Sequence, residues 1–316
     1  YDHALDEREI VRRHYAERRA EKSADRAIEL IRQHRDERLF VWVHFQDPHG
    51  PYAPPPDYRG LFREPDAEPK TLPLSSSLSG RGGIPNYQRL GGNRDYHHYV
   101  SQYDGEIRYL DDHFDRLIRA IADLGLYDDA VIIFTADHGE GMGNHQYYFA
   151  HGENLYTDLI HVPLIIRYGE RSGRRSDFVQ HIDLVPTLRS ILGLERDARL
   201  RGRDLLAGEA GEPAEIFAEM DSPTVRDHVK TALLYDGYKL IHTPRFDSFE
   251  LYDLRTDFHE KRNLLKDSEA SPRAERMKAR LKAISEEDRL GLAIEGGEAT
   301  RTEAELETLR ALGYAR

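Results

Sequence analysis

A short motif that follows an apolar run of strand length is the clearest candidate for chemistry in this sequence. The segment 135–141, TADHGEG, places Asp137 next to His138. Adjacent side chains of a strand point to opposite faces, but where a strand turns into a loop both can converge on one ion. The glycines that follow allow a ligand to approach the backbone closely. The motif therefore indicates a metal site, although Asp137 as a helix cap beside a packed His138 would give the same sequence.

Two further segments carry histidines in loops. His49 stands in DPHGPY between Pro48 and Pro51, where a fixed imidazole can donate to an anionic oxygen or act as a general acid. The alternative is a histidine that only bonds the turn backbone. His145 and His151, in NHQYYFAHGENLY, could bind an anion or a metal, or be ordinary loop residues. The other histidines considered are given no role, and the first three of them are expected on the surface: His97, His98, His113 and His181.

Apolar runs of strand length must position these side chains. LFVWVHF at 39–45, AVIIFTA at 130–136 and HVPLIIRYG at 161–169 are typical of buried strands. Strands that alternate with long helical crossovers predict an α/β fold with a mostly parallel sheet flanked by helices. Loops at the carboxyl ends of parallel strands meet at one edge of the sheet, so we expect His49 and Asp137 to converge there.

The rest of the chain divides into helices, one long loop and a different C-terminal pattern. Helical spacing is present in 4–38, 95–124 and 183–193, and 53–94 is a loop rich in Pro, Gly and Ser. TALLYDGYKLIHT and FELYDL then predict antiparallel strands joined by a DG turn, followed by a helical tail. We therefore predict a catalytic α/β domain at 1–211 and a small antiparallel α+β subdomain at 212–316.

Composition excludes several classes of function. The formal net charge of -12 argues against a general nucleic-acid binder, which usually presents a basic surface. No apolar run approaches the roughly 20 residues that a membrane helix needs. The chain has no cysteine, which excludes disulfides, thiolate metal sites and a cysteine nucleophile within these residues.

Taken in order, these segments resemble the sulfatase family of the alkaline-phosphatase superfamily. The resemblance is carried by LFVWVHFQDPHGPYAPPPDY, by the stretch from YDGEIRYLDD to TADHGEGMGNH, by HGENLYTDLIHVPLIIR and by HIDLVPTLRSILGL. DGYKLI, FELYDLRTD and LRALGY are similar to the ends of bacterial members. The resemblance extends from about residue 38 to 316 and implies the alkaline-phosphatase-like fold.

The resemblance also implies roles for the candidate residues. Asp137 and His138 would be metal ligands, and His49 would contact a sulfate oxygen or the leaving-group oxygen. His151 lies near the position where many members have a lysine that contacts sulfate. The family implies Ca²⁺, whereas an Asp-His pair also suits Mn²⁺ or Zn²⁺. The implied substrate is a sulfated small molecule or glycan.

One part of the family pattern is absent from the sequence. Sulfatases carry paired metal-binding aspartates and a Cys/Ser-x-Pro-x-Arg motif near their N-terminus, and that Cys or Ser becomes the formylglycine nucleophile. Here neither Ser222-Pro223 nor Ser271-Pro272 forms that motif, so we expect the chain to match the C-terminal two-thirds of the family. Any export signal would lie in the preceding part. Two alternatives stay open: a phosphonate or phosphate ester hydrolase, or an inactive fragment or half-enzyme.

Overall fold

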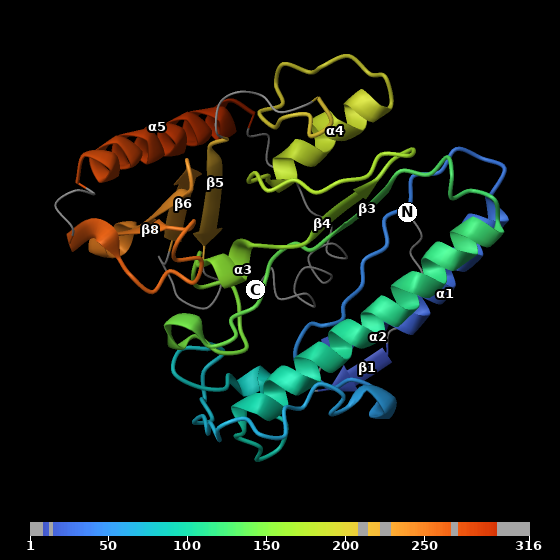
Figure 1. Ribbon diagram of the computed structural model, residues 1–316, viewed down its shortest axis with the longest axis horizontal. Helices are drawn as coiled ribbons and strands as arrows, with labels where there is room; N and C mark the ends of the chain where they lie inside the picture. The colour runs from blue at the N-terminus through green and yellow to red at the C-terminus, as the bar shows by residue number, and fades with distance from the viewer. Residues whose placement is uncertain (1–8, 13–14, 208–213, 222–228, 267–270, 296–316) are drawn as a thin grey trace. The chain divides into compact units, whose positions relative to one another are not determined.

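The computed structural model describes residues 9–12, 15–207, 214–221, 229–266 and 271–295. Its main elements, labelled in Figure 1 where there is room, are β1 (Glu9–Arg12), β2 (Tyr15–Glu17), α1 (Ala20–Gln33), α2 (Tyr96–Asp123), β3 (Ile132–Thr135), α3 (Thr157–Ile160), β4 (Leu164–Arg167), α4 (Leu184–Ile191), β5 (Ile216–Asp221), β6 (Val229–Tyr235), β7 (Tyr238–Thr243), β8 (Ser248–Asp253) and α5 (Ser271–Glu295).

The described residues form two compact units. The first contains the chain up to His151 together with His161–Arg171, and the second contains Gly152–Ile160 and the described residues from Ser172 onward. The predicted boundary between residues 211 and 212 falls within 208–213, outside the described residues, and stays a prediction. None of the helices in the described part of the chain is both long and apolar enough to cross a bilayer.

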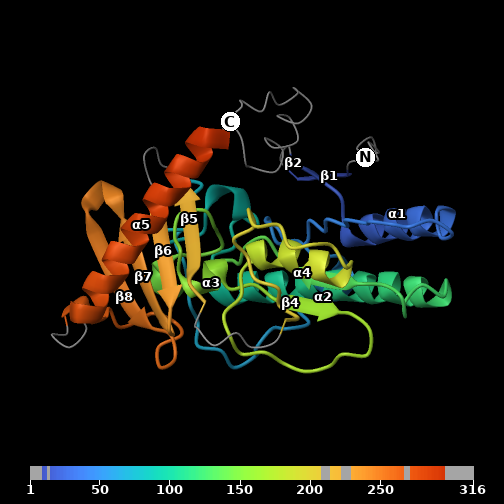
Figure 2. The ribbon, with the colours of Figure 1, turned by 90° about the horizontal axis from the view of Figure 1, so that it is seen from above.

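The first unit is organised around the long helix α2, which was expected at 95–124. Asp95 caps its N-terminus by accepting a hydrogen bond from the backbone N–H of His97 at 3.0 Å. Helix α1 lies along α2 in both ribbon views (Figures 1 and 2). Ala27 and Ile31 of α1 pack against Leu117 of α2 in one buried cluster. The apolar stripes read from the sequence thus become a helix pair.

The N-terminal segment differs from the prediction of one or two helices over 4–38. Only α1 is helical, while β1 and β2 form a short antiparallel pair, and residues 1–8 lie outside the described residues. The strand β1 contains the β-branched pair Ile10-Val11, which favours extended backbone. The many charged residues of segment 4–38 therefore did not distinguish a helix from a hairpin at its beginning.

The predicted strand at 39–45 is extended but has no strand partner among the described residues. Its side chains alternate: Val43 and Phe45 pack on the cluster between α1 and α2, whereas Phe40 and Trp42 are 83% and 81% exposed. A buried strand needs a neighbour on its hydrogen-bonding edge and cover on both faces. This segment has cover on one face only, so the prediction of a buried strand was wrong for these residues.

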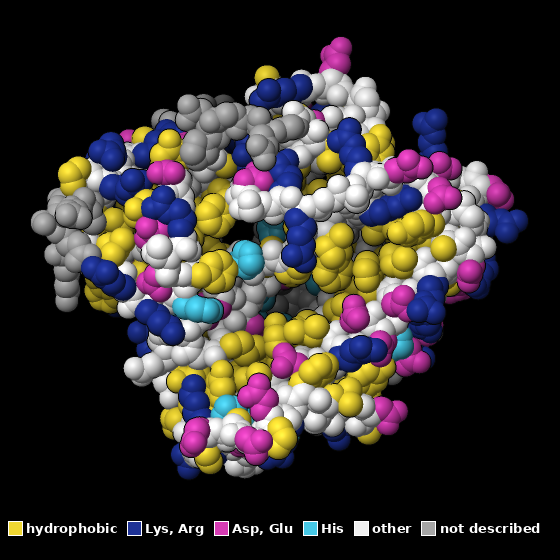
Figure 3. All heavy atoms as spheres, in the orientation of Figure 1, with side chains coloured by type: hydrophobic (Ala, Val, Ile, Leu, Met, Phe, Trp, Pro, Cys, Tyr) yellow, Lys and Arg dark blue, Asp and Glu magenta, His cyan; other side chains and the backbone are white. Residues whose placement is uncertain are grey.

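The strands β3 and β4 pair antiparallel, not parallel as expected, with Thr135 opposite Leu164. Because the two strands run in opposite directions, the segment that connects them begins and ends at the same end of the sheet, and no crossover is needed. Every pairing of named strands in the described chain is antiparallel. Apolar side chains gather on the face that carries these strands in Figure 3, and Ile165 of β4 is 61% exposed.

The second unit contains the antiparallel sheet that the sequence predicts. Its strand order is β5-β6-β7-β8, and Tyr235 pairs with Tyr238 across a two-residue turn. Asp236 and Gly237 both have positive φ, +49° and +73°, as a type I′ hairpin turn requires. Helix α5 covers one face of the sheet (Figure 2), where apolar side chains of both elements form a buried cluster. The expected short final helix at LRALGY lies outside the described residues.

A buried ion pair ties this sheet to the segment before it. The Lys239 ammonium on β7 lies 2.7 Å from the Glu260 carboxylate, and both side chains are almost fully buried. The second oxygen of Glu260 accepts the backbone N–H of Thr157, at the start of α3, at 2.6 Å. Burial lowers the pKa of Lys239, and the nearby Glu260 opposes that shift. The pair fixes α3 against the sheet.

Trp42, the single tryptophan of the chain, provides a direct test of its exposed position. We expect its fluorescence to have the red-shifted maximum of a hydrated indole and to be quenched strongly by iodide. The measurement is an emission spectrum with a Stern–Volmer titration, and the unfolded protein serves as the reference. A blue-shifted, quencher-resistant emission at low protein concentration would contradict the described exposure.

Replacing Lys239 by methionine should strongly destabilise the second unit, because Glu260 would then be a buried charge without its partner. We expect a loss of about 3–5 kcal/mol in the free energy of unfolding, measured by urea denaturation. The matched control is Lys282→Met on α5, whose side chain is 78% exposed and whose pair with Glu286 spans 4.0 Å. That control should cost less than about 1 kcal/mol. Equal losses in both variants would contradict a structural role for the buried pair.

Candidate functional site

The segment that carries His49 is fastened to both helices of the first unit. The carboxylate of Asp47 accepts the backbone N–H of Ala20, the first residue of α1, at 2.7 Å. The buried carboxylate of Glu106 on α2 accepts the backbone N–H of Ala53 at 2.5 Å. These bonds satisfy backbone donors that a proline-rich loop cannot pair within a ladder. His49 is therefore presented by a loop held at both ends.

The loop that follows β3 folds back toward the DHGEG turn at its own beginning. Gly141 makes two backbone hydrogen bonds to the returning segment, since its N–H donates to the carbonyl of Ala150 and its carbonyl accepts from the N–H of Phe149. A Cβ at Gly141 would lie 2.6 Å from the Tyr147 ring and 3.0 Å from the Ala150 oxygen, so only glycine allows this close approach. The hydroxyl of Tyr147 then donates to the carbonyl of His151 at 2.9 Å. The return thus brings His151 beside the DHGEG turn.

Three histidines from the two loops meet in one cluster. The ring centroids of His138 and His151 are 4.0 Å apart, and those of His49 and His151 are 5.8 Å apart. The structure thus brings together His49, His138 and His151, with Asp137 adjacent to His138 in the chain. We call these four residues together with Glu140 the histidine cluster.

Asp137 and His138 each place one possible metal-donor atom near the other. His138 Nδ1 donates to the carbonyl of Gly139 at 2.8 Å, because a carbonyl only accepts, and this leaves the Nε2 lone pair available. Asp137 accepts the backbone N–H of His138 with Oδ1 at 2.9 Å, and its Oδ2 lies 3.7 Å from Nε2. Two atoms that each lie about 2.0–2.2 Å from one ion can be separated by this distance.

The donor set fits a divalent ion as part of a coordination shell. Within the described residues, no group of three or more His, Cys, Asp or Glu side chains is arranged to hold a metal. A carboxylate oxygen and a neutral imidazole nitrogen nevertheless form a chemically suitable pair for Mn²⁺ or Zn²⁺. Burial, followed by the neighbouring His151, lowers the pKa of His138 and favours the neutral ring that ligation requires.

Glu140 is the functional candidate that sequence reasoning missed. Its side chain is 7% exposed, and one carboxylate oxygen lies 3.4 Å from His151 Nδ1. Burial alone would lower the pKa of His151, but the Glu140 carboxylate outweighs it and the net shift is upward. The adjacent imidazoles of His138 and His151 are therefore biased toward opposite protonation states. The acidic residue that directly follows Asp137, His138 and Gly139 in DHGEG is the sequence signal that could have identified Glu140.

The other histidine candidate, His145, lies apart from these contacts. It is exposed at the tip of the return loop, with a φ of +53°. His98 and His113 were expected on the surface, but both are partly buried, and burial lowers the pKa of each. Sequence spacing did not reveal this, because the cover comes from distant segments.

Comparison with protein families gives two matches. The Sulfatase family model matches residues 4–194, and the model described as N-sulphoglucosamine sulphohydrolase, C-terminal, matches residues 143–287. The uncharacterized sulfatase YidJ of Escherichia coli K12 is 29% identical over 268 residues, which cover 78% of this chain and 51% of that protein. This chain spans about half the length of the curated relatives it matches.

Solved structures show the same fold. A crystal structure of the sulfatase YidJ from Bacteroides fragilis superposes with a TM-score of 0.66 at 24% identity, covering 84% of this chain and 58% of that one. The phosphonate monoester hydrolase of Agrobacterium radiobacter gives a TM-score of 0.65 at 24% identity, covering 85% of this chain and 62% of that one. The α/β fold predicted from the sequence is thus confirmed as alkaline-phosphatase-like. Because the Sulfatase model matches more than half of its residues, the chain belongs to the sulfatase family.

Proposed function

We propose that this chain forms part of a metal-dependent hydrolase of sulfate esters and that the histidine cluster is its site. The observation that carries the proposal is the convergence of His49, His138 and His151 from two loops at the ends of apolar segments. Membership in the sulfatase family supports sulfate ester hydrolysis as the reaction class. The match to an N-sulphoglucosamine sulphohydrolase model supports a sulfated sugar as the substrate class.

Each residue of the cluster has a separate task in this proposal. Asp137 Oδ2 and His138 Nε2 hold the divalent ion, whose charge, once bound, offsets the negative charge on sulfate oxygens. His151, with its raised pKa, keeps a proton close to those oxygens, and Glu140 orients its ring. His49 donates a hydrogen bond or a proton to the leaving-group oxygen. Together, these groups would stabilise the negative charge that develops on the sulfate and leaving-group oxygens during the reaction.

The nature of the ion follows from the ligand types. Sulfatases generally use a divalent metal, and the family implies Ca²⁺. Calcium takes six to eight oxygen ligands, whereas imidazole suits Mn²⁺ or Zn²⁺ better. The nitrogen ligand His138 therefore favours Mn²⁺ or Zn²⁺ over Ca²⁺ in this chain.

A second candidate is the hydrolysis of phosphonate or phosphate esters. The Asp137-His138 pair is compatible with it, because a nitrogen ligand suits either chemistry. The structural likeness to a phosphonate monoester hydrolase supports the fold but not the substrate. Both sulfate and phosphonate esters present tetrahedral oxyanions, so the same cluster with a bound divalent ion would accept either.

Metal binding by the 316-residue chain is the first test. We expect Mn²⁺ to bind weakly, as observed by electron paramagnetic resonance or titration calorimetry, because two protein ligands leave most of the shell to water. Asp137→Asn should weaken this binding by about tenfold or more, since it removes the anionic ligand. The matched control is Asp129→Asn, a nearby aspartate in the connection before β3. Equal Mn²⁺ affinities for the two variants would contradict the assignment of Asp137.

Turnover is the test of the reaction itself. In the natural gene product, assayed with sulfated sugars, aryl sulfates and phosphonate monoesters, we expect sulfate esters to be preferred. His49→Ala should lower kcat by roughly 10²–10⁴, the usual contribution of a general acid or base. The exposed His145 provides the control, and His145→Ala should leave kcat unchanged within about twofold.

Residues 1–316 by themselves should show no sulfatase turnover, because the sequence has no cysteine and neither Ser-Pro pair forms the nucleophile motif. Turnover that persists through repurification and disappears in Asp137→Asn would place the nucleophile within these residues. A kcat for His49→Ala equal to that of His145→Ala would remove His49 from the mechanism.

A further inference from the structure

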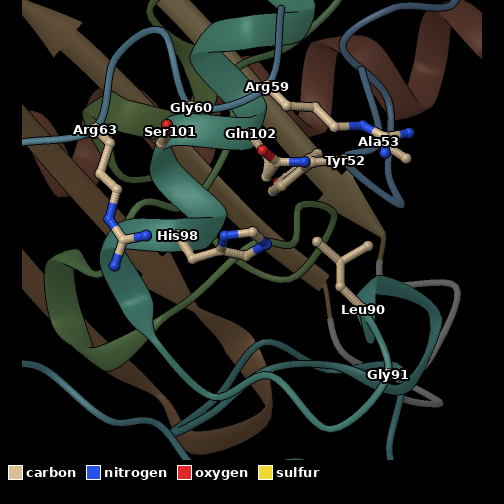
Figure 4. Close-up of a pocket in the computed structure, with 10 residues that line it drawn as sticks. All are labelled: Tyr52, Ala53, Arg59, Gly60, Arg63, Leu90, Gly91, His98, Ser101 and Gln102. Carbon is tan, nitrogen blue, oxygen red and sulfur yellow. The ribbon is translucent and has the colours of Figure 1, made fainter. Parts of the chain in front are cut away.

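A cavity of about 520 Å³ opens in the first unit beside the N-terminal half of α2. Its walls come from four segments (Figure 4). They are α2, with His98, Ser101 and Gln102; the turn that carries Arg59 and Arg63; Tyr52 with its neighbour; and Leu90 with Gly91. We call it the α2 pocket. Its size lies within the range of about 300–1,000 Å³ that is typical of small-molecule sites.

The charge of the α2 pocket is positive. Arg59 and Arg63 both line it, and none of the described residues that line it is acidic. Arg59 donates through Nε to the carbonyl of Pro54 at 2.9 Å, which holds the guanidinium stem in place. Arg63 lies 3.7 Å from Asp95, but that carboxylate also caps α2. In Figure 4 the Arg63 guanidinium points toward His98.

A buried donor completes the pocket. Ser101 is 3% exposed, and its hydroxyl has no hydrogen-bond partner among the residues that the structure describes. A buried hydroxyl without a partner carries a desolvation penalty of about 1–3 kcal/mol, so native proteins normally satisfy it. A ligand oxygen in the α2 pocket would accept its hydrogen bond. Burial lowers the pKa of His98, so this ring is neutral at pH 7 and can also accept or donate.

The remaining walls are apolar. Leu90 and the ring of Tyr52 line the α2 pocket together with backbone at Gly60 and Gly91. Guanidinium groups and hydroxyl donors select oxyanions, and they bind them through charge-assisted hydrogen bonds. An apolar wall next to them adds affinity only for a ligand that has a carbon skeleton.

We propose that the α2 pocket binds the sulfate or carboxylate group of a small organic molecule, with Arg59, Arg63 and Ser101 as the recognition residues. The pocket is separate from the histidine cluster, because none of His49, Asp137, His138 or His151 lines it. Tyr52 is the nearest link between the two: it lines the pocket, and burial followed by the charge of Glu140 raises its pKa.

The test uses the 316-residue protein and three probes: glucosamine 6-sulfate, glucuronate and inorganic sulfate. Binding is followed by titration calorimetry and by NMR of the histidine side chains, with the His98 signal assigned from a His98→Gln variant. We expect a millimolar or tighter dissociation constant for at least one organic probe, with a ligand-dependent shift at His98. Weaker binding of inorganic sulfate identifies the contribution of the apolar walls.

Charge reversal distinguishes this site from general attraction of anions. Arg63→Glu should weaken the organic probe at least about tenfold, the size expected for one charge-assisted hydrogen bond. Arg119→Glu on the same helix is the matched control, since Arg119 is 77% exposed and pairs with Asp115 outside the pocket. Ser101→Ala, which leaves the charge intact, should weaken binding severalfold, and circular dichroism verifies the fold of each variant.

Four results would each overturn the proposal. The first two are the absence of binding at 50 mM probe (about fifty times a 1 mM dissociation constant) and equal affinity for inorganic and organic anions. The other two are equal affinities for Arg63→Glu and Arg119→Glu, and shifts at His49, His138 or His151 without one at His98. The proposal does not depend on the histidine cluster. Asp137→Asn should therefore leave binding to the α2 pocket unchanged even where it weakens Mn²⁺ binding.

Discussion

The buried carboxylate of Glu106 is the contact on which the site depends most. It lies on α2 and accepts the backbone N–H of Ala53, four residues after His49. At the other end of the same loop, the carboxylate of Asp47 accepts a hydrogen bond from the backbone N–H of the first residue of α1. Since α1 and α2 pack along one another, the loop that presents His49 is held between two elements that share a core. A rigid scaffold that carries catalytic residues on anchored loops is the usual way to hold reacting groups in place.

The second half of the site is organised by a loop that returns to its own origin. Because β3 and β4 pair antiparallel, the chain leaves and re-enters the sheet at one end. The backbone hydrogen bonds of Gly141 to Phe149 and Ala150 fold the intervening residues back. His151 thereby comes to lie beside His138, although 13 positions separate them in the sequence. Glu140 then raises the pKa of His151, whereas burial lowers the pKa of His138. One antiparallel pairing thus provides the geometry that was expected from the ends of parallel strands.

The two units differ in how their polar and charged groups are paired. In the second unit, Lys239 and Glu260 neutralise one another, and Glu260 also takes the Thr157 N–H, so the pair is structural. In the first unit, Arg59, Arg63 and the unpartnered Ser101 hydroxyl line an open pocket with no acidic residue in its lining. Satisfied buried charge stabilises a fold, whereas unsatisfied donors at a cavity are available to a ligand. This contrast is the physical reason why the α2 pocket, and not the buried ion pair, is the candidate for binding.

Local sequence by itself determined the elements whose signals are short-range. The DG turn specified the β6–β7 hairpin, because only residues that tolerate positive φ fit a two-residue turn. Helical spacing predicted α2 nearly to its ends. The motifs around His49, Asp137, His138 and His151 pointed to four of the five residues of the histidine cluster. Tertiary structure alone decided what depends on distant partners. The apolar run at 39–45 was predicted as a buried strand, yet Trp42 is exposed, because burial requires cover that no local pattern encodes. The partners of Glu140 and Lys239 were likewise invisible in the sequence, since they come from segments that only folding brings together.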